Sequence, residues 1–79
     1  MITIPVYLRD MYDAKHLVQI AESCEQDVDL ICGRYVVDAK SMLGVFSLPQ
    51  FDSVKISVDE SEYHEVLKKL QSLNLVKEF

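Results

Sequence analysis

Ser41 is the residue whose type and position best suit chemistry on a protein surface. It stands before Met42-Leu43-Gly44-Val45-Phe46-Ser47-Leu48, a run that predicts a short helix. A serine at a helix start caps the helix, because its hydroxyl accepts a hydrogen bond from a free backbone N–H group. Met42, Leu43 and Phe46 have the spacing i, i+1 and i+4, and we expect an exposed apolar patch that binds a protein. The alternative is that these side chains only fill the core.

The two histidines, His16 and His64, are both expected on the surface of helices. His16 lies in a helix predicted from Met11 to Cys24, more than one turn beyond its start. It is therefore away from the free N–H groups that would stabilise a phosphoryl group. Asp10 precedes this helix, and its carboxylate is expected to cap it. An acyl-phosphate site on Asp10 would need clustered carboxylates, magnesium and a lysine, and the chain offers no such set.

Cys24 and Cys32 form neither a C-x-x-C pair nor a zinc-like cluster, so no metal or cofactor is expected. We expect both to remain reduced thiols in a cytoplasmic protein. The formal net charge of −5 argues against sequence-independent binding of nucleic acid, which requires a basic face. No apolar run approaches the roughly 20 residues that span a bilayer, and the N-terminus lacks the pattern of a signal peptide.

Apolar periodicity divides the 79 residues into seven elements of one domain. Alternation predicts four strands, at Ile2–Leu8, Val28–Cys32, Tyr35–Val37 and Val54–Val58. Helical spacing predicts three helices, which cover Met11–Cys24, Ser41–Leu48 and the segment after Asp59. The first of these helices should bury Met11, Ala14, Leu17, Val18, Ala21 and Cys24. The last should bury Tyr63, Val66, Leu67, Leu70 and Leu73.

Turn and capping residues complete the predicted fold. Pro5 lacks an N–H donor, which favours an edge position for the first strand. Gly33-Arg34 suits a type II′ hairpin. The pairs Asp10/Asp13 and Asp59/Glu62 have the spacing of capping boxes. The order β-α-β-β-α-β-α predicts an α+β open-faced sandwich, in which a four-stranded antiparallel sheet carries three helices on one face.

Two segments align with one known family at a single offset and without a gap. Ala39-Lys40-Ser41-Met42-Leu43-Gly44-Val45-Phe46-Ser47-Leu48 is similar to L-K-S-I-M-G-V-M-S-L, and Leu17-Val18-Gln19-Ile20-Ala21 is similar to L-V-Q-T-A. Both are segments of HPr, the histidine-containing phosphocarrier of the bacterial sugar phosphotransferase system. The resemblance covers nearly the whole chain and implies a single HPr-like domain over residues 1–79.

In the same register, the family's phosphoacceptor signature H-A-R-P-A falls on Asp10-Met11-Tyr12-Asp13-Ala14. Asp10 stands in the place of the histidine, Tyr12 in that of the arginine and Asp13 in that of the proline. Two carboxylates would repel a phosphoryl group, and Arg9 is a poor substitute for the arginine. The resemblance therefore implies a degenerate member without histidine phosphotransfer or independent catalytic activity, similar to catabolite-repression HPr.

The resemblance also implies a regulatory role for Ser41, whose family counterpart is phosphorylated by the ATP-dependent HPr kinase. The leading hypothesis is a regulatory or adaptor protein that binds partners through Ser41 and through Met42, Leu43 and Phe46. The expected partners are HPr kinase/phosphorylase or a transcriptional regulator. The alternative is a phosphocarrier that still takes phosphate on His16 or Asp10. A third hypothesis is recruitment of the fold as a scaffold or sensing domain.

Overall fold

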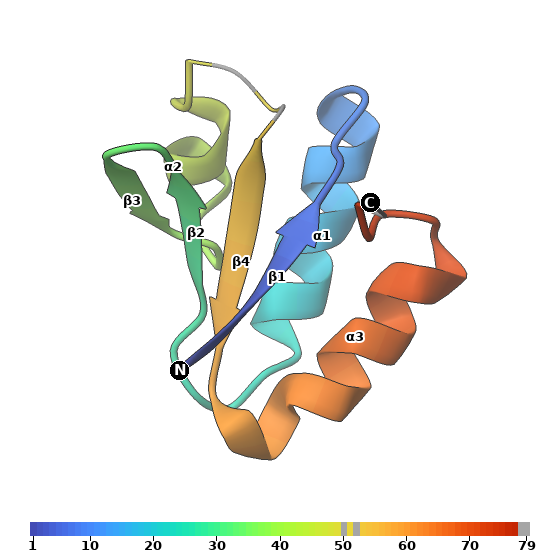
Figure 1. Cartoon of the computed structure of the whole chain (residues 1–79). Helices are drawn as coiled ribbons and strands as arrows, with labels where there is room; N and C mark the ends of the chain where they lie inside the picture. The colour runs from blue at the N-terminus through green and yellow to red at the C-terminus, as the bar shows by residue number, and fades with distance from the viewer. Residues whose placement is uncertain (50, 52, 78–79) are drawn as a thin grey trace.

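The computed structural model describes residues 1–49, 51 and 53–77 of the chain (Figure 1). Its elements, in chain order, are β1 (Ile2–Val6), α1 (Met11–Glu22), β2 (Asp29–Cys32), β3 (Tyr35–Asp38), α2 (Met42–Phe46), β4 (Val54–Val58), the 3₁₀ helix η1 (Glu60–Glu62) and α3 (Tyr63–Ser72). The expected order β-α-β-β-α-β-α is confirmed, and the single turn η1 is an addition to it. Of the loop expected to end α2, Gln50 and Asp52 lie outside the described residues.

The four strands form one antiparallel sheet in the order β1-β4-β2-β3. The three α-helices lie on one face of it, as predicted, and the other face is open (Figure 1). Pro5 lies on the edge strand β1 opposite Lys55, where its missing N–H costs no ladder bond. Gly33 has a φ of 58° and Arg34 does not have a positive φ, which is the pattern of a type II′ rather than a type I′ turn.

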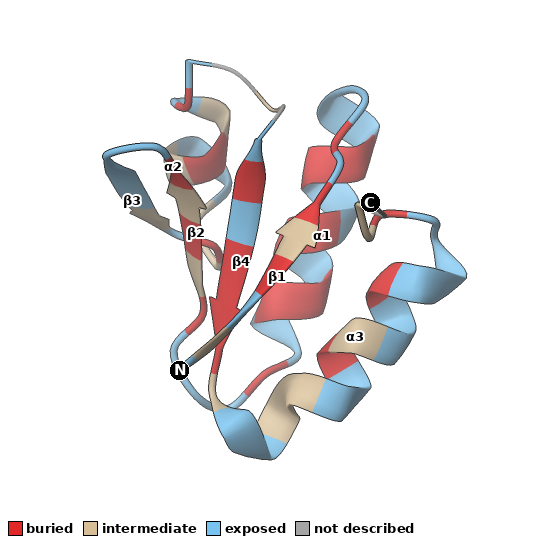
Figure 2. Ribbon diagram, in the orientation of Figure 1, coloured by how far each residue is buried: buried red, intermediate tan, exposed pale blue. Residues whose placement is uncertain are grey.

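The core lies between the helices and the inner face of the sheet (Figure 2). Leu17 of α1, Leu30 of β2, Ile56 of β4 and Leu70 of α3 are all fully buried. Burial of such side chains is the main favourable term in folding, at roughly 1.5–3 kcal/mol each. The elements other than β3 therefore contribute buried apolar side chains to one common core, whereas on β3 only Val37 packs against it and Tyr35 and Val36 are exposed.

Helix α3 ends differently from the prediction. The periodicity predicted that Leu73 would be buried, which is wrong, since it is 38% exposed. Asn74 has a φ of 57°, and the N–H groups of Asn74 and Leu75 donate to the carbonyls of Gln71 and Leu70. This is a Schellman motif, and the turn that it makes buries Leu75 in place of Leu73.

The first predicted capping box is half formed, and the second is not formed. Asp10 caps α1 by accepting a hydrogen bond from the Asp13 N–H at 3.0 Å, but the Asp13 carboxylate binds Arg9 instead of Asp10. Asp59 caps η1 through Ser61, because the 3₁₀ turn precedes α3. Glu62 consequently lies before α3 and accepts hydrogen bonds from a different part of the chain.

The described residues contain no helix with the length and apolar character needed to cross a membrane. Cys24 and Cys32 are both buried thiols, as predicted. Burial is the main cause that raises the pKa of the Cys24 thiol. The Cys24 thiol donates a hydrogen bond to the Ile20 carbonyl oxygen, with a distance of 3.6 Å from Sγ to the oxygen.

Candidate functional site

Three charged side chains occupy the start of helix α1. The Asp13 carboxylate accepts hydrogen bonds from the Arg9 backbone N–H at 2.9 Å and from its guanidinium at 2.9 and 3.4 Å. Asp10 supplies the cap on the same turn. Asp13 is buried, whereas about half of the Arg9 side chain is exposed. The helix start is thus filled by the chain's own carboxylates.

This pairing changes the proton affinity of both partners. The hydrogen bonds from Arg9 hold the pKa of the Asp13 carboxyl below its ordinary value, although burial of the carboxyl opposes the change. The same contact raises the pKa of Arg9. Asp13 therefore stays negative near neutral pH, and an incoming anion would meet its charge and that of Asp10.

Ser41 caps helix α2, as predicted. Its hydroxyl accepts a hydrogen bond from the Gly44 N–H at 3.1 Å, and its own backbone is extended. Gly44 packs closely on this cap, since a Cβ built on it would lie 3.4 Å from both the Cβ and the Oγ of Ser41. The Lys40 ammonium donates to the Cys24 carbonyl at 2.9 Å and ties this turn to the end of α1.

The apolar side chains after Ser41 are exposed to different degrees. Leu43 is 85% exposed and Met42 is 37% exposed, whereas Phe46 is half-buried and packs against the core. The expected patch is therefore present at Met42 and Leu43, and Phe46 belongs to both the patch and the core.

Helix α1 extends this patch in a way that the sequence did not predict. Met11, Tyr12 and Lys15 line a hollow of about 400 Å³ together with Met42 and Phe46. Tyr12 is 74% exposed and Met11 is 60% exposed, so the prediction that Met11 is buried is wrong. Met11 is the first residue of α1, beyond the part of the helix that packs on the core. We call Met11, Tyr12, Met42, Leu43 and Phe46 the docking surface.

A protein-family model described as "PTS HPr component phosphorylation site" matches residues 11–74. The chain belongs to the HPr family. It is also similar to a solved structure titled "Crystal structure of HPr-C-His from Thermoanaerobacter tengcongensis". The two share 26% sequence identity with a TM-score of 0.69, over 91% of this chain and 86% of the other. A search of curated proteins gives no match.

The match confirms the expected HPr-like α+β fold and the link to the sugar phosphotransferase system. HPr proteins are phosphocarriers that interact with other proteins of this system and have no independent catalytic activity. The role of a member of this family therefore depends on two properties: which proteins bind it, and which of its residues can hold a phosphoryl group.

The two histidines of this HPr relative lie away from the start of α1. His16 is exposed in the second turn of α1, six residues after Asp10. His64 is exposed on α3, with its ring 5.3 Å from that of Tyr63 in an edge-to-face arrangement. Within the described ranges, no three His, Cys, Asp or Glu side chains lie close enough to hold a metal ion.

Proposed function

We propose that this chain is a regulatory or adaptor member of the HPr family that binds a partner protein through Ser41 and the docking surface. One observation carries the proposal: exposed apolar side chains from two helices converge on one hollow beside a helix-capping serine. Exposed apolar patches of this kind are typical of protein-binding sites, since their contact with water is unfavourable. Two of the five side chains are methionines, which adapt readily to a partner's shape.

The start of α1 supports a role without histidine phosphotransfer. In the register of the family resemblance, Asp10 stands in the place of the phosphoacceptor histidine and Tyr12 in that of the arginine. A phosphoryl group would need free N–H groups and a guanidinium. Here Asp10 caps the helix and Asp13 engages Arg9, the nearest guanidinium.

The competing proposal is a phosphocarrier that uses His16 or Asp10, and it has less support. His16 lies within the helix, where the backbone N–H groups donate to carbonyls of the preceding turn. Phosphate on Asp10 would displace the cap and would approach the charge of Asp13. His16 thus lacks the stabilisation that the start of a helix gives to an anion, and at Asp10 the neighbouring Asp13 carboxylate opposes it.

Ser41 is the proposed site of regulatory phosphorylation. Its oxygen already faces the Gly44 N–H, and a phosphate in this place keeps an acceptor for that group. The added charge would lie next to Met42 at the border of the docking surface. Phosphorylation would therefore change what the docking surface binds and leave the helix formed. We infer partners of the HPr kinase/phosphorylase or transcriptional-regulator type, in the cytoplasm.

Incubation with ATP and HPr kinase tests this function, with the added phosphate located by peptide mapping. The expected result is one phosphoryl group on Ser41, none in Ser41→Ala, and unchanged modification in Ser47→Ala. Ser47 lies at the other end of the same short helix and is the matched control. Phosphate that persists in Ser41→Ala would contradict the proposed site.

A further inference from the structure

The two edges of the sheet differ in what lies beside them. At β1 the segment that follows α3 runs along the outer side of the strand. There the Tyr7 N–H donates to the Leu75 carbonyl at 2.8 Å, and the Lys77 N–H donates to the Pro5 carbonyl at 3.0 Å. β3 is the last strand at the other edge and pairs only with β2. In the part of the chain that the structure describes, no segment pairs along the outer side of β3.

The side chains of β3 are unusually apolar for an uncovered edge. Tyr35 is 53% exposed and Val36 is 61% exposed, whereas Val37 packs against the core (Figure 2). An edge strand presents unpaired backbone groups to any other strand, and proteins commonly protect it with lysine or proline. Tyr35-Val36-Val37 contains neither residue. This edge is therefore suited to pairing with a further strand.

The ladder between β2 and β3 fixes which backbone groups face outward. The Ala39 N–H donates to the Val28 carbonyl at 2.9 Å, just beyond the ends of the two strands. Successive residues of an antiparallel strand alternate between bonding to one neighbour and facing the other way. Tyr35 and Val37 therefore bond to β2, whereas the N–H and C=O groups of Val36 point to the outer side.

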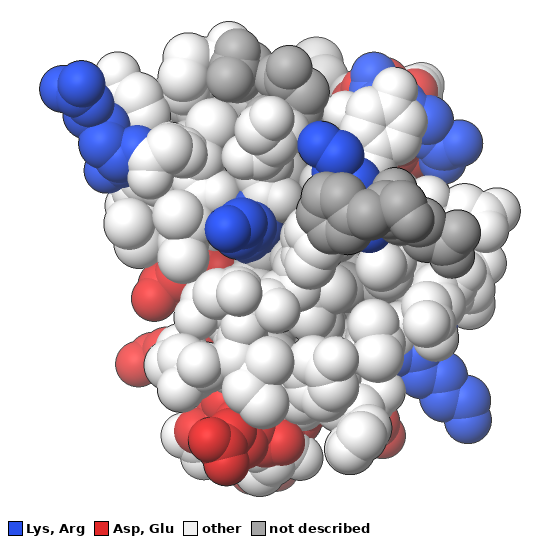
Figure 3. Space-filling view, in the orientation of Figure 1, with Lys and Arg blue, Asp and Glu red and all other residues white. Residues whose placement is uncertain are grey.

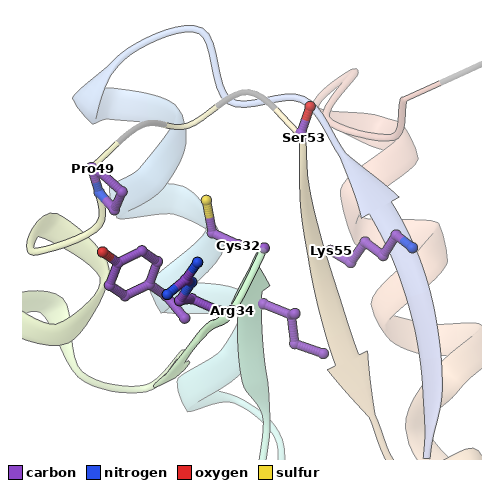
Figure 4. Close-up of a pocket in the computed structure, with 8 residues that line it drawn as sticks. Cys32, Arg34, Pro49, Ser53 and Lys55 are labelled. Carbon is purple, nitrogen blue, oxygen red and sulfur yellow. The ribbon is translucent and has the colours of Figure 1, made fainter.

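Charged residues of opposite sign stand at the two ends of β3. Arg34 lies in the turn before the strand, and Asp38 is the last residue of the strand. In Figure 4, Arg34 and Lys55 lie on opposite sides of β2, so Arg34 belongs to the outer, β3 side of the hairpin. On the side of the molecule where β3 lies, Figure 3 shows blue atoms at the upper end and red atoms further down.

This charge pattern is complementary to itself. When a second β3 runs antiparallel to the first, with Val36 opposite Val36, the Arg34 of each copy lies opposite the Asp38 of the other. Opposite charges in such cross-strand positions attract each other. Within one copy, Asp38 lies opposite Asp29 of β2, another carboxylate. An arginine from a second copy would thus approach two negative charges.

We propose that the outer side of β3 binds a second copy of this chain. The two β3 strands pair antiparallel about a two-fold axis at Val36, whose N–H in each copy donates to the Val36 carbonyl of the other. Tyr35 of each copy then lies opposite Val37 of the other. Two strands of four residues cover much less than the roughly 1,600 Å² of a standard interface, so the dimer dissociates readily. This edge is separate from the docking surface, so the dimer does not depend on the proposed adaptor function.

Sedimentation velocity over a range of protein concentrations tests the proposal, and we expect a reversible equilibrium between monomer and dimer. Val36→Lys should raise the dissociation constant at least about tenfold, because two ammonium groups would meet at the axis. The matched control is Thr3→Lys, which changes an exposed β-branched residue on the opposite edge strand and should leave the constant unchanged. Circular dichroism reports whether each variant is folded.

A reversal of charge tests the register of the two strands. Arg34→Glu should raise the dissociation constant about tenfold, since it places like charges opposite each other at both ends of the interface. The double variant Arg34→Glu/Asp38→Lys should restore the affinity of the wild type. A purely structural role of Arg34 would give no such rescue.

Four results would overturn the proposal. One is a chain that stays monomeric at the highest concentration, and another is an unchanged dissociation constant in Val36→Lys. The third is a dimer that is lost in Thr3→Lys or Leu43→Asp but kept in Val36→Lys, which would assign the interface to the β1 edge or to the docking surface. The fourth is a double variant that is no tighter than Arg34→Glu.

Discussion

Asp13 is the most informative single residue, because it is a buried carboxylate at a helix start that an anion would otherwise occupy. Its contact with Arg9 combines a backbone and a side-chain donor. The carboxylate also lies near the positive end of the α1 dipole, which stabilises negative charge. The residue therefore contributes to the stability of α1 and opposes a phosphoryl group at the same place.

Asp13→Asn should lower the free energy of unfolding at pH 7 by about 1 kcal/mol, since the Arg9 contact is half exposed to solvent. The pKa of Asp13 is lowered in the folded state, relative to about 3.9 when unfolded. Its contribution is thus fully present above that unfolded value, and it is lost as the pH falls through the lower folded pKa.

Urea denaturation of the wild type and of Asp13→Asn between pH 7 and pH 2 measures this difference. We expect a constant difference at neutral pH that shrinks in the acid range. Asp27→Asn, at an exposed loop position, is the matched control and should show little change. A difference that stays constant down to pH 2 would show that the ionised carboxylate has no part in the effect.

The helix caps were predictable from the sequence, whereas the partners of the other charged side chains were not. The caps by Asp10 and Ser41 were predicted correctly, because an N-cap depends only on the three residues that follow it. The partners of Asp13 and Glu62 were not. They depend on the guanidinium of Arg9 and on a loop 36 residues away.

Helix α2 is short, at five residues, and depends strongly on its cap. Ser41→Ala should lower the free energy of unfolding by about 1 kcal/mol, because the Gly44 N–H loses its acceptor. Ser41→Asp keeps an acceptor and should be close to the wild type. Chemical denaturation measures both. Equal destabilisation of the two variants would show that the hydroxyl does not act as a cap.

The docking surface is formed by two helices, and its exposed leucine allows binding to be tested apart from folding. Leu43→Asp should change the free energy of unfolding by less than about 0.5 kcal/mol, since Leu43 is 85% exposed. It should weaken binding of HPr kinase about tenfold or more.

Isothermal titration calorimetry of the kinase with Leu43→Asp measures this effect. The matched control is Leu73→Asp, which changes an exposed leucine at the end of α3. Its affinity should equal that of the wild type. Equal affinities of Leu43→Asp and the wild type would exclude this leucine from the interface.

The sequence predicted only the α2 half of the docking surface. Periodicity identified Met42, Leu43 and Phe46 because they follow one another on one helix. It assigned Met11 to the core, since an apolar residue at helical spacing looks the same at the exposed first turn as in the buried middle. The hollow depends on how α1 and α2 pack together, which periodicity does not contain.

Across the whole molecule, charged side chains join segments that are far apart in the chain. The Glu62 carboxylate accepts hydrogen bonds from the backbone N–H groups of Glu25 at 2.8 Å and Gln26 at 3.0 Å. The Lys69 ammonium donates to the Ser23 hydroxyl at 3.0 Å. These contacts fasten the start and the last turn of α3 to the segment that follows α1 and hold the helical layer together.

Glu62→Ala should speed amide hydrogen exchange at Glu25 and Gln26 and lower the free energy of unfolding by about 1–2 kcal/mol. Glu60→Ala, an exposed position two residues earlier, is the control and should change neither. NMR-detected exchange measures the effect. Unchanged exchange at both amides would mean that these bonds do not persist in solution.

The fold as a whole was the best-predicted feature, because the elements other than β3 had apolar stripes that one core could bury. The end of the chain was the exception. The left-handed turn at Asn74 exchanged Leu73 for Leu75 in the core, and apolar spacing does not encode a change of direction.

Incubation of the chain with phosphoenolpyruvate and enzyme I, read by intact mass at neutral pH, tests most directly whether the chain lacks histidine phosphotransfer. We expect no added phosphoryl group, because Asp10 and Asp13 occupy the start of α1 and neither histidine lies there. An HPr protein that carries the histidine is the positive control. Transfer of one phosphoryl group to this chain, mapped to His16 or Asp10, would show instead that the chain is a phosphocarrier.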